Sequence, residues 1–137
     1  NCTVVLSARP IGSPISKSPH GLIALNLPSL DKFEDTVRPG GVIVVNTSLI
    51  NRLPHRTDVT VVAVPANEVA IECGSPKAAN MVTLGAYLGA SSIVDLDQVK
   101  AIVTESFAAK PKLIEINHAA LSRGFALGQA KTAAAVR

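Results

Sequence analysis

The chain has 137 residues, 47% of them hydrophobic, which is enough apolar side chain for one domain with a buried core. Its net charge of +3 comes from scattered Lys and Arg, and its aromatic residues are three Phe and one Tyr. This composition argues against nucleic-acid binding, and the apolar runs are too short to cross a bilayer. We therefore expect a single domain over residues 1–137 that binds neither nucleic acid nor membrane.

The first twenty residues are predicted to form a short strand and then a loop. The run CTVVL, residues 2–6, is rich in β-branched side chains and is closed by Arg9 and a proline. Cys2 and Cys73 lack the spacing of metal ligands, and two cysteines in a chain this apolar indicate reduced, buried thiols in a cytoplasmic protein.

Three further apolar runs predict strands at residues 22–25, 42–45 and 59–64. The last two runs are almost continuously apolar, which is typical of strands buried on both faces of a parallel sheet. Between the first two, Ser29 is expected to cap a helix that extends to Val37 and stops before a Pro-Gly-Gly turn.

The second half of the chain is predicted to be helical. Helices are expected at residues 66–73, at residues 77–88, from Asp95 or Asp97 to the break at Pro111, and from residue 112 to residue 126 or beyond. Residues 91–94, between the second and third of these helices, are either a short edge strand or a connector. Strands that alternate with helices, followed by closing helices, fit a three-layer α/β/α sandwich with a mainly parallel sheet best.

The helix expected from residue 77 onward is apolar on almost every side. Such a helix is either central to its domain or covered by another chain. We expect one face against the sheet and the other face near a partner or a symmetry mate. On that basis Gly85→Leu is expected to disrupt association before it unfolds the domain.

Polar residues follow two of the predicted strands. Asn26 follows the first, and Asn46, Thr47 and Ser48 follow the second. The carboxyl ends of strands in an open α/β sheet commonly face ligands, so these groups are candidates to hold a phosphate, a carboxylate or a neighbouring backbone, with Asn46 exposed. The alternative is that they satisfy turn and cap positions.

No residue set predicts a catalytic centre or a metal site. The three histidines, His20, His55 and His118, are far apart in sequence and are interpreted as surface or packing residues. The sequence contains no nucleophile elbow, CxxC pair, P-loop or HExxH motif.

Six segments, which cover most of the chain, carry a resemblance to a known family. They are PIGSP at residues 10–14, LIALNLPSLDKFE at 22–34, PGGVIVVNTSLI at 39–50, VPANEVAIECG at 64–74, KAANMVTLGAYLG at 77–89 and EINHAALSRG at 115–124. In this order they resemble the gamma subunit of 2-oxoacid:acceptor oxidoreductases, the pyruvate/ketoisovalerate oxidoreductase catalytic domain family.

The resemblance implies a gamma subunit that is inactive alone. In the whole complex, a 2-oxoacid and coenzyme A give acyl-CoA, carbon dioxide and a reduced acceptor such as ferredoxin. Thiamine diphosphate and iron–sulfur clusters are expected in partner subunits of the alpha, beta and delta type, and none is expected in this chain. A homodimer is a further candidate for its association. The alternative function is a non-catalytic α/β binding or scaffolding domain for a small anionic ligand.

Two further expectations concern the N-terminal part of the chain. Arg9, Gly12 and Ser13 are expected to form part of a docking surface near coenzyme A, although Arg9 is otherwise a solvated loop charge. The family normally begins with a glycine-rich strand-turn-helix, and nothing similar precedes Asn1, so the chain is expected to be N-terminally incomplete.

Overall fold

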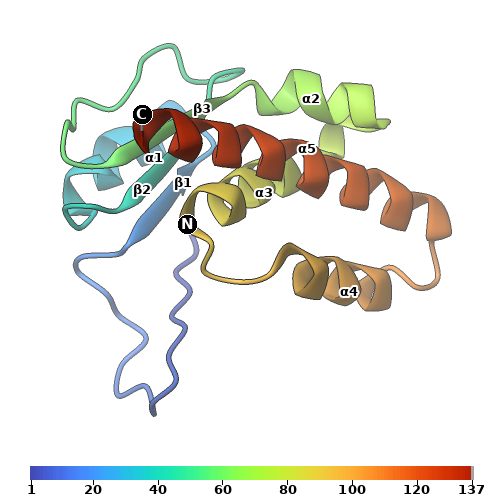
Figure 1. Ribbon diagram of the computed structural model, residues 1–137, viewed down its shortest axis with the longest axis horizontal. Coiled ribbons are helices and arrows are strands. Elements are labelled where there is room, and N and C mark those ends of the chain that lie inside the picture. Colours follow the sequence, from blue (N-terminus) through green and yellow to red (C-terminus); the bar gives the residue numbers. More distant parts are fainter. Residues whose placement is uncertain (137) are drawn as a thin grey trace.

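The computed structural model describes residues 1–136, with side chains up to residue 132, and has a parallel sheet between layers of helices (Figure 1). The elements in chain order are β1 (Gly21–Ala24), α1 (Leu27–Phe33), the 3-10 helix η1 (Glu34–Thr36), β2 (Val42–Asn46), β3 (Thr60–Val64), α2 (Ala66–Cys73), the 3-10 helix η2 (Pro76–Ala78), α3 (Ala79–Ser91), α4 (Leu96–Ser106) and α5 (Pro111–Val136).

The strands lie in the order β1-β2-β3, and both pairs are parallel. Val42 is opposite both Gly21 and Thr60, so the three strands begin level, and β2 ends level with β3, where Asn46 is opposite Val64, and one residue beyond β1. All five β2 residues are buried because helices cover both faces of the sheet. The three predicted strands and the α/β class are confirmed.

Alternate residues of β2 point into two separate cores. Ile43 and Val45 pack with α1 and with the loop after β2, whereas Val42 and Val44 pack with α2, α3 and α5. The sheet therefore lies between a thin layer, α1, and a thick layer of three helices, and α4 packs on the outside of α5 (Figure 1).

The predicted strand at residues 2–6 is wrong. Residues 1–20 form no helix or strand and make an irregular arm, whose tip projects from the domain while its N-terminal end returns toward the domain in the view of Figure 1. Cys2 is consequently exposed, against expectation, while Cys73 is half-buried. Residues 91–94 form no edge strand: residue 91 ends α3, and residues 92–94 belong to the connector.

Helix starts depend on short polar side chains. The first helix begins earlier than predicted, because the Asn26 Oδ1 atom, not Ser29, caps it by accepting from the Ser29 N–H at 3.0 Å. Asp95 is the cap of α4, and its carboxylate accepts from the Asp97 N–H at 3.2 Å.

Glycines bring α3 and α5 into direct backbone contact. A Cβ atom added to Gly85 would overlap the carbonyl oxygen of Leu121, and one added to Gly124 would overlap that of Val82. Gly89 and Gly128, one turn further along each helix, repeat the arrangement. The face of α3 that was expected near a partner is thus covered by α5 of the same chain, so the structure favours unfolding over loss of association for Gly85→Leu.

We predict that Gly85→Leu lowers the free energy of unfolding by about 1 to 3 kcal/mol or more, because the side chain has no room beside Leu121. Thermal melting measures the loss. Gly12→Leu is the control, since an added Cβ there meets nothing within 4 Å. A lower oligomeric mass at an unchanged melting temperature would contradict this packing.

Candidate functional site

The candidate site is the edge of the sheet at the carboxyl ends of the strands. Asn46 is the last residue of β2, and Thr47 and Ser48 form the turn that follows it. The neighbouring strand β3 leads directly into α2 through Pro65. The turn after β2 therefore lies beside the first residues of α2.

Asn46 is 1% exposed, which contradicts its expected position on the surface. Its Oδ1 atom accepts from the Ser48 N–H at 3.1 Å and from the Ala66 N–H at 3.2 Å. Its Nδ2 group donates to the Asn67 Oδ1 atom at 3.1 Å. One amide thus joins two segments twenty residues apart in the chain.

Ser48 makes the second connection between the turn and α2. Its Oγ atom accepts from the Asn67 N–H at 3.0 Å and donates to the Glu68 carboxylate. This hydrogen bond lowers the pKa of Glu68, which is ionised in the first turn of α2, where the helix dipole favours a negative charge. We call Asn46, Ser48, Asn67 and Glu68 the edge cluster.

The backbone N–H groups that could bind an anion at this edge are already hydrogen-bonded within the protein. The N–H groups of Ser48, Ala66 and Asn67 all donate to side chains of the cluster. This arrangement favours the turn-and-cap role over anion binding. Thr47 and Asn26 are exposed, and Asn26 caps α1.

Arg9, Gly12 and Ser13 lie away from this edge. The arm that carries them enters β1 at its first residue, and the His20 carbonyl at its base accepts from the Val42 N–H at 2.9 Å. The arm is therefore attached at the amino ends of the strands, and the seven predicted site residues form two separate groups.

A buried carboxylate that the sequence did not single out holds the loop between β2 and β3. Glu34 is 5% exposed and accepts from the Arg52 guanidinium at 2.7 Å and from the His55 N–H at 3.1 Å. The Arg52 hydrogen bond is the main reason that the pKa of Glu34 is lowered. Arg56 adds hydrogen bonds to the carbonyl oxygens of Glu34 and Val37.

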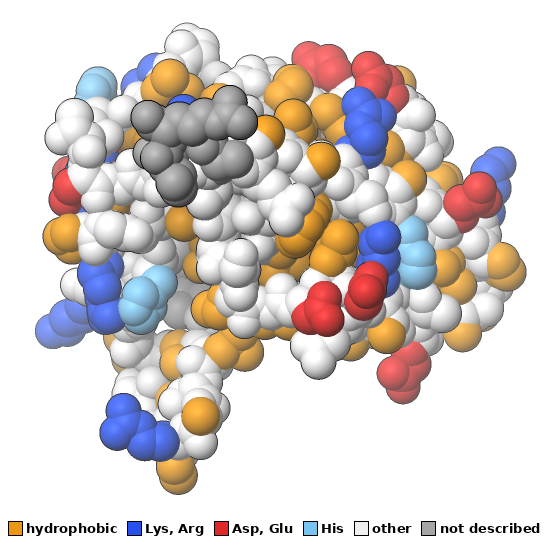
Figure 2. Space-filling model, in the orientation of Figure 1, with side chains coloured by type: hydrophobic (Ala, Val, Ile, Leu, Met, Phe, Trp, Pro, Cys, Tyr) orange, Lys and Arg blue, Asp and Glu red, His pale blue; other side chains and the backbone are white. Residues whose placement is uncertain are grey.

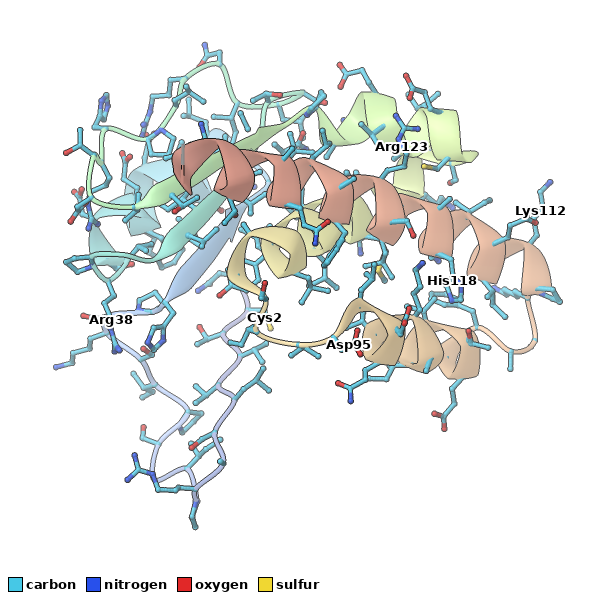
Figure 3. All side chains as sticks on the ribbon, in the orientation of Figure 1. Cys2, Arg38, Asp95, Lys112, His118 and Arg123 are labelled. Atoms are coloured by element: carbon cyan, nitrogen blue, oxygen red, sulfur yellow. The ribbon has the colours of Figure 1, made fainter. Side chains whose placement is uncertain are left out.

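A groove of about 560 Å³ lies between α2 and α5. Its apolar lining is Pro65, Val69, Ala126 and Leu127, and its polar lining is Glu68, Glu72, Ser122 and Arg123. Arg123 is on the side of α5 that faces α2 (Figure 3), and its guanidinium pairs with the Glu72 carboxylate at 2.7 Å.

His20 and His55 are exposed and His118 is half-buried, which agrees with their interpretation as surface or packing residues. His118 lies between α5 and α4 (Figure 3), and its Nε2 atom is 2.9 Å from the Lys100 carbonyl oxygen. His20 Nε2 accepts from Arg38 at 2.7 Å. Within residues 1–136 no group of three or more His, Cys, Asp or Glu is placed to hold a metal ion. No helix of that part combines the length and apolar character needed to cross a membrane.

The fold and the edge define an open α/β domain whose strand ends are closed by its own side chains. Residues 1–127 match the protein-family model for pyruvate ferredoxin/flavodoxin oxidoreductase. The chain belongs to this family, and the membership expected from the sequence segments is confirmed.

Relatives with assigned names are oxidoreductase subunits. The chain is 36% identical over 126 residues to ketoisovalerate oxidoreductase subunit VorA of Methanothermobacter marburgensis, covering 90% of this chain and 26% of VorA. It is 31% identical over 125 residues to 2-oxoglutarate synthase subunit KorC of Methanocaldococcus jannaschii, covering 89% of this chain and 65% of KorC. The chain thus spans about a quarter of VorA and just under two thirds of KorC.

Solved structures share the fold. The gamma subunit of a keto/oxoacid ferredoxin oxidoreductase from Geobacter sulfurreducens superposes with a TM-score of 0.69 at 27% identity, covering 81% of this chain and 64% of that subunit. The 2-oxoglutarate:ferredoxin oxidoreductase of Magnetococcus marinus, solved with 2-oxoglutarate, coenzyme A and succinyl-CoA bound, gives a TM-score of 0.69 at 24% identity, with 81% of this chain and 20% of that chain covered.

We predict that Asn46→Ala lowers the free energy of unfolding by about 2 to 4 kcal/mol, because it removes the acceptor of two N–H groups, each worth about 1 to 3 kcal/mol when left unpaired. Urea unfolding measures the loss. Thr47→Ala, one residue away and exposed, is the control and is expected to change the value by less than about 0.5 kcal/mol. Unchanged stability with weakened assembly would instead make Asn46 a contact residue.

The lowered pKa of Glu34 predicts an acid-dependent loss of stability. Ionised Glu34 stabilises the fold above its unfolded pKa of about 4.3, and this contribution is lost as the pH falls through the lower folded-state value. Glu34→Gln is therefore expected to lower the melting temperature more at pH 7 than at pH 3.

The control for Glu34 is Glu105→Gln, which removes an exposed carboxylate from α4. This variant is expected to keep the parent dependence of melting temperature on pH. If Glu34→Gln followed the parent curve as well, the Arg52 hydrogen bond would not be a source of stability.

Proposed function

We propose that this chain is the gamma component, or its matching part, of a 2-oxoacid:ferredoxin or other acceptor oxidoreductase. The observation that carries the proposal is the family match, which covers residues 1–127. Relatives from two genera are named as a ketoisovalerate oxidoreductase subunit and a 2-oxoglutarate synthase subunit.

The proposed reaction oxidatively decarboxylates a 2-oxoacid. The bond between the carboxyl group and the oxo carbon breaks and releases carbon dioxide, and a thioester bond forms between the remaining acyl group and the coenzyme A sulfur. Two electrons pass to the acceptor and one proton is released. Thiamine diphosphate and the iron–sulfur clusters that serve such chemistry are proposed to be bound by the other subunits.

This chain is proposed to supply surface and not the reacting groups. The chain has two cysteines, whereas an iron–sulfur cluster usually takes four from a protein. His20 and His118 form hydrogen bonds within the fold. The edge cluster fixes the turn after β2 in one conformation. A rigid edge with exposed Thr47 and Leu49 suits docking against another subunit.

The test is co-production of this chain with the thiamine-binding and iron–sulfur subunits of the same organism, followed by purification through a tag on this chain. The purified complex is expected to reduce ferredoxin or methyl viologen only when both coenzyme A and a 2-oxoacid are added. Pyruvate, 2-oxoglutarate and 2-oxoisovalerate are assayed side by side.

The chain purified alone is the control. It is expected to contain neither iron nor thiamine diphosphate and to show no activity with any of the three acids. Stoichiometric iron in the pure chain, or a complex that forms and reduces the acceptor equally well without this chain, would overturn the proposal.

A further inference from the structure

A buried amide without a hydrogen-bond partner is the feature that the fold and the proposed function leave unexplained. Asn117, in the first half of α5, is 8% exposed. The other buried asparagine, Asn46, uses both polar atoms of its side chain in hydrogen bonds, whereas no group of the described residues bonds to the side-chain amide of Asn117. An unpaired amide in an apolar setting costs stability, so it needs an explanation of its own.

The amide of Asn117 opens into a pocket. Within residues 1–136, every side-chain nitrogen or oxygen atom that is fully shielded from solvent has a hydrogen-bond partner, so the unpaired atoms of Asn117 must be reached from a cavity. Asn117 lines a pocket of about 200 Å³ between η2, the start of α3, the end of α4 and the start of α5. In Figure 1, α4 lies beside this half of α5. The walls of the pocket therefore come from residues 75–117, in the middle part of the chain.

Much of the pocket wall is apolar. Met81, Phe107, Leu113 and Ile116 line it, and we call them the apolar wall. A cube of the pocket's volume has an edge of about 6 Å, whereas an α-helix with its side chains is about 10 to 12 Å across. The volume is also below the roughly 300 to 1,000 Å³ of sites for drug-sized ligands. The occupant that fits is a small molecule with a short hydrocarbon chain.

The polar part of the pocket favours a negatively charged ligand. Lys77 is the charged residue of the lining, and it takes part in none of the ion pairs of the described chain. Asn80 also lines the pocket, and because its Oδ1 atom accepts from the Met81 N–H at 2.9 Å, its Nδ2 group is left as a donor. An ammonium group beside amide donors binds a carboxylate through charge-assisted hydrogen bonds. The described lining contains no acidic residue that would attract a cation.

The larger groove between α2 and α5 lacks these properties. Its Arg123 guanidinium is paired with Glu72, and its Glu68 carboxylate accepts from Ser48, so both charges already have partners within the fold. On the face shown in Figure 2, acidic and basic side chains are interspersed and form no field of one sign. The pocket at Asn117 is thus where an unpaired cation and an unpaired amide come together.

We propose that this pocket is a binding site for a small aliphatic carboxylate. The carboxylate of the ligand pairs with Lys77 and Asn80, and its hydrocarbon chain contacts the apolar wall. The Asn117 amide binds a second polar group, an oxo or hydroxyl oxygen next to the carboxylate. The inference does not rest on the proposed function, because every residue of the pocket belongs to this chain.

The test is an NMR titration of the purified chain with 2-hydroxyisovalerate, which has a carboxylate, a neighbouring hydroxyl group and a branched hydrocarbon chain. It is not a 2-oxoacid, so its binding is separate from the proposed reaction. The side-chain amide signals of Asn117 and the methyl signals of Leu113 and Ile116 are expected to shift and to saturate together. The matched compound 3-methyl-2-butanol, with a methyl group in place of the carboxylate, is expected to bind about tenfold more weakly or less.

Three variants separate the pocket from a general effect of surface charge. Lys77→Gln removes the positive charge, and Asn117→Asp adds a negative charge at unchanged size, so each is expected to weaken binding about tenfold or more. Lys131→Gln, which removes an exposed lysine from the other half of α5, is the control and is expected to bind as the parent does.

A fourth variant, Asn117→Leu, tests whether the amide serves the ligand or the fold. It replaces an unpaired amide by an apolar group of similar size, so binding is expected to be lost while the melting temperature stays the same or rises. A lower melting temperature would show that the amide serves the fold through a bound water, and the inference would fail.

The remaining outcomes also overturn the inference. Shifts that do not saturate, or that 3-methyl-2-butanol produces equally well, would show that the pocket holds water and no carboxylate. Equal weakening by Lys131→Gln and Lys77→Gln would assign the effect to the net charge of the chain. None of these results changes the standing of the proposed function, which the co-produced complex tests separately.

Discussion

The close approach of α3 and α5 is the constraint on which the other parts of this fold depend. Three strands give a sheet only about 10 to 15 Å wide, whereas three helices at the usual spacing of 8 to 10 Å span about 16 to 20 Å. Gly85 and Gly124 remove the side chains that would hold the two helices apart, so both reach the apolar side chains of the sheet. The same approach leaves the outer side of α5 free for α4, and it closes one face of the β2 core without help from another chain.

Buried polar side chains hold the loop between β2 and β3. Asn46 and Glu34 are both almost fully buried, and each accepts hydrogen bonds from a segment about twenty residues away. Asn46 fixes the start of the loop between β2 and β3, and Glu34 fixes its middle, at Arg52 and His55. A small domain with few aromatic residues thus holds its longest loop by amide, carboxylate and guanidinium contacts, and this leaves the strand ends with a defined shape and little free hydrogen-bonding capacity.

The sequence predicted those features that a local pattern determines. Runs of β-branched residues located β2 and β3, and the uniformly apolar character of α3 predicted its burial. The sequence did not reveal what covers α3, because close packing against a partner and close packing against a second helix of the same chain require the same small residues. The glycines spaced four apart in both helices were nevertheless a signal that the two helices pack together. The direction of Asn46 was equally hidden, since an asparagine after a strand looks the same whether it faces solvent or the N–H of Ala66. The ion pair of Glu34 with Arg52 joins residues eighteen apart in the chain, a separation at which no periodicity helps.

The attachment of α4 has a consequence for the motions of the domain. Val103 is the buried side chain of this helix, and its polar link to α5 runs through His118, which contacts the Lys100 carbonyl and the Thr104 hydroxyl. Because Val103 is its one buried side chain, α4 is expected to open locally at a lower free-energy cost than global unfolding. The chain between α3 and α5 is therefore expected to move more than the two helices that it connects, whose backbones are held together at the glycine contacts.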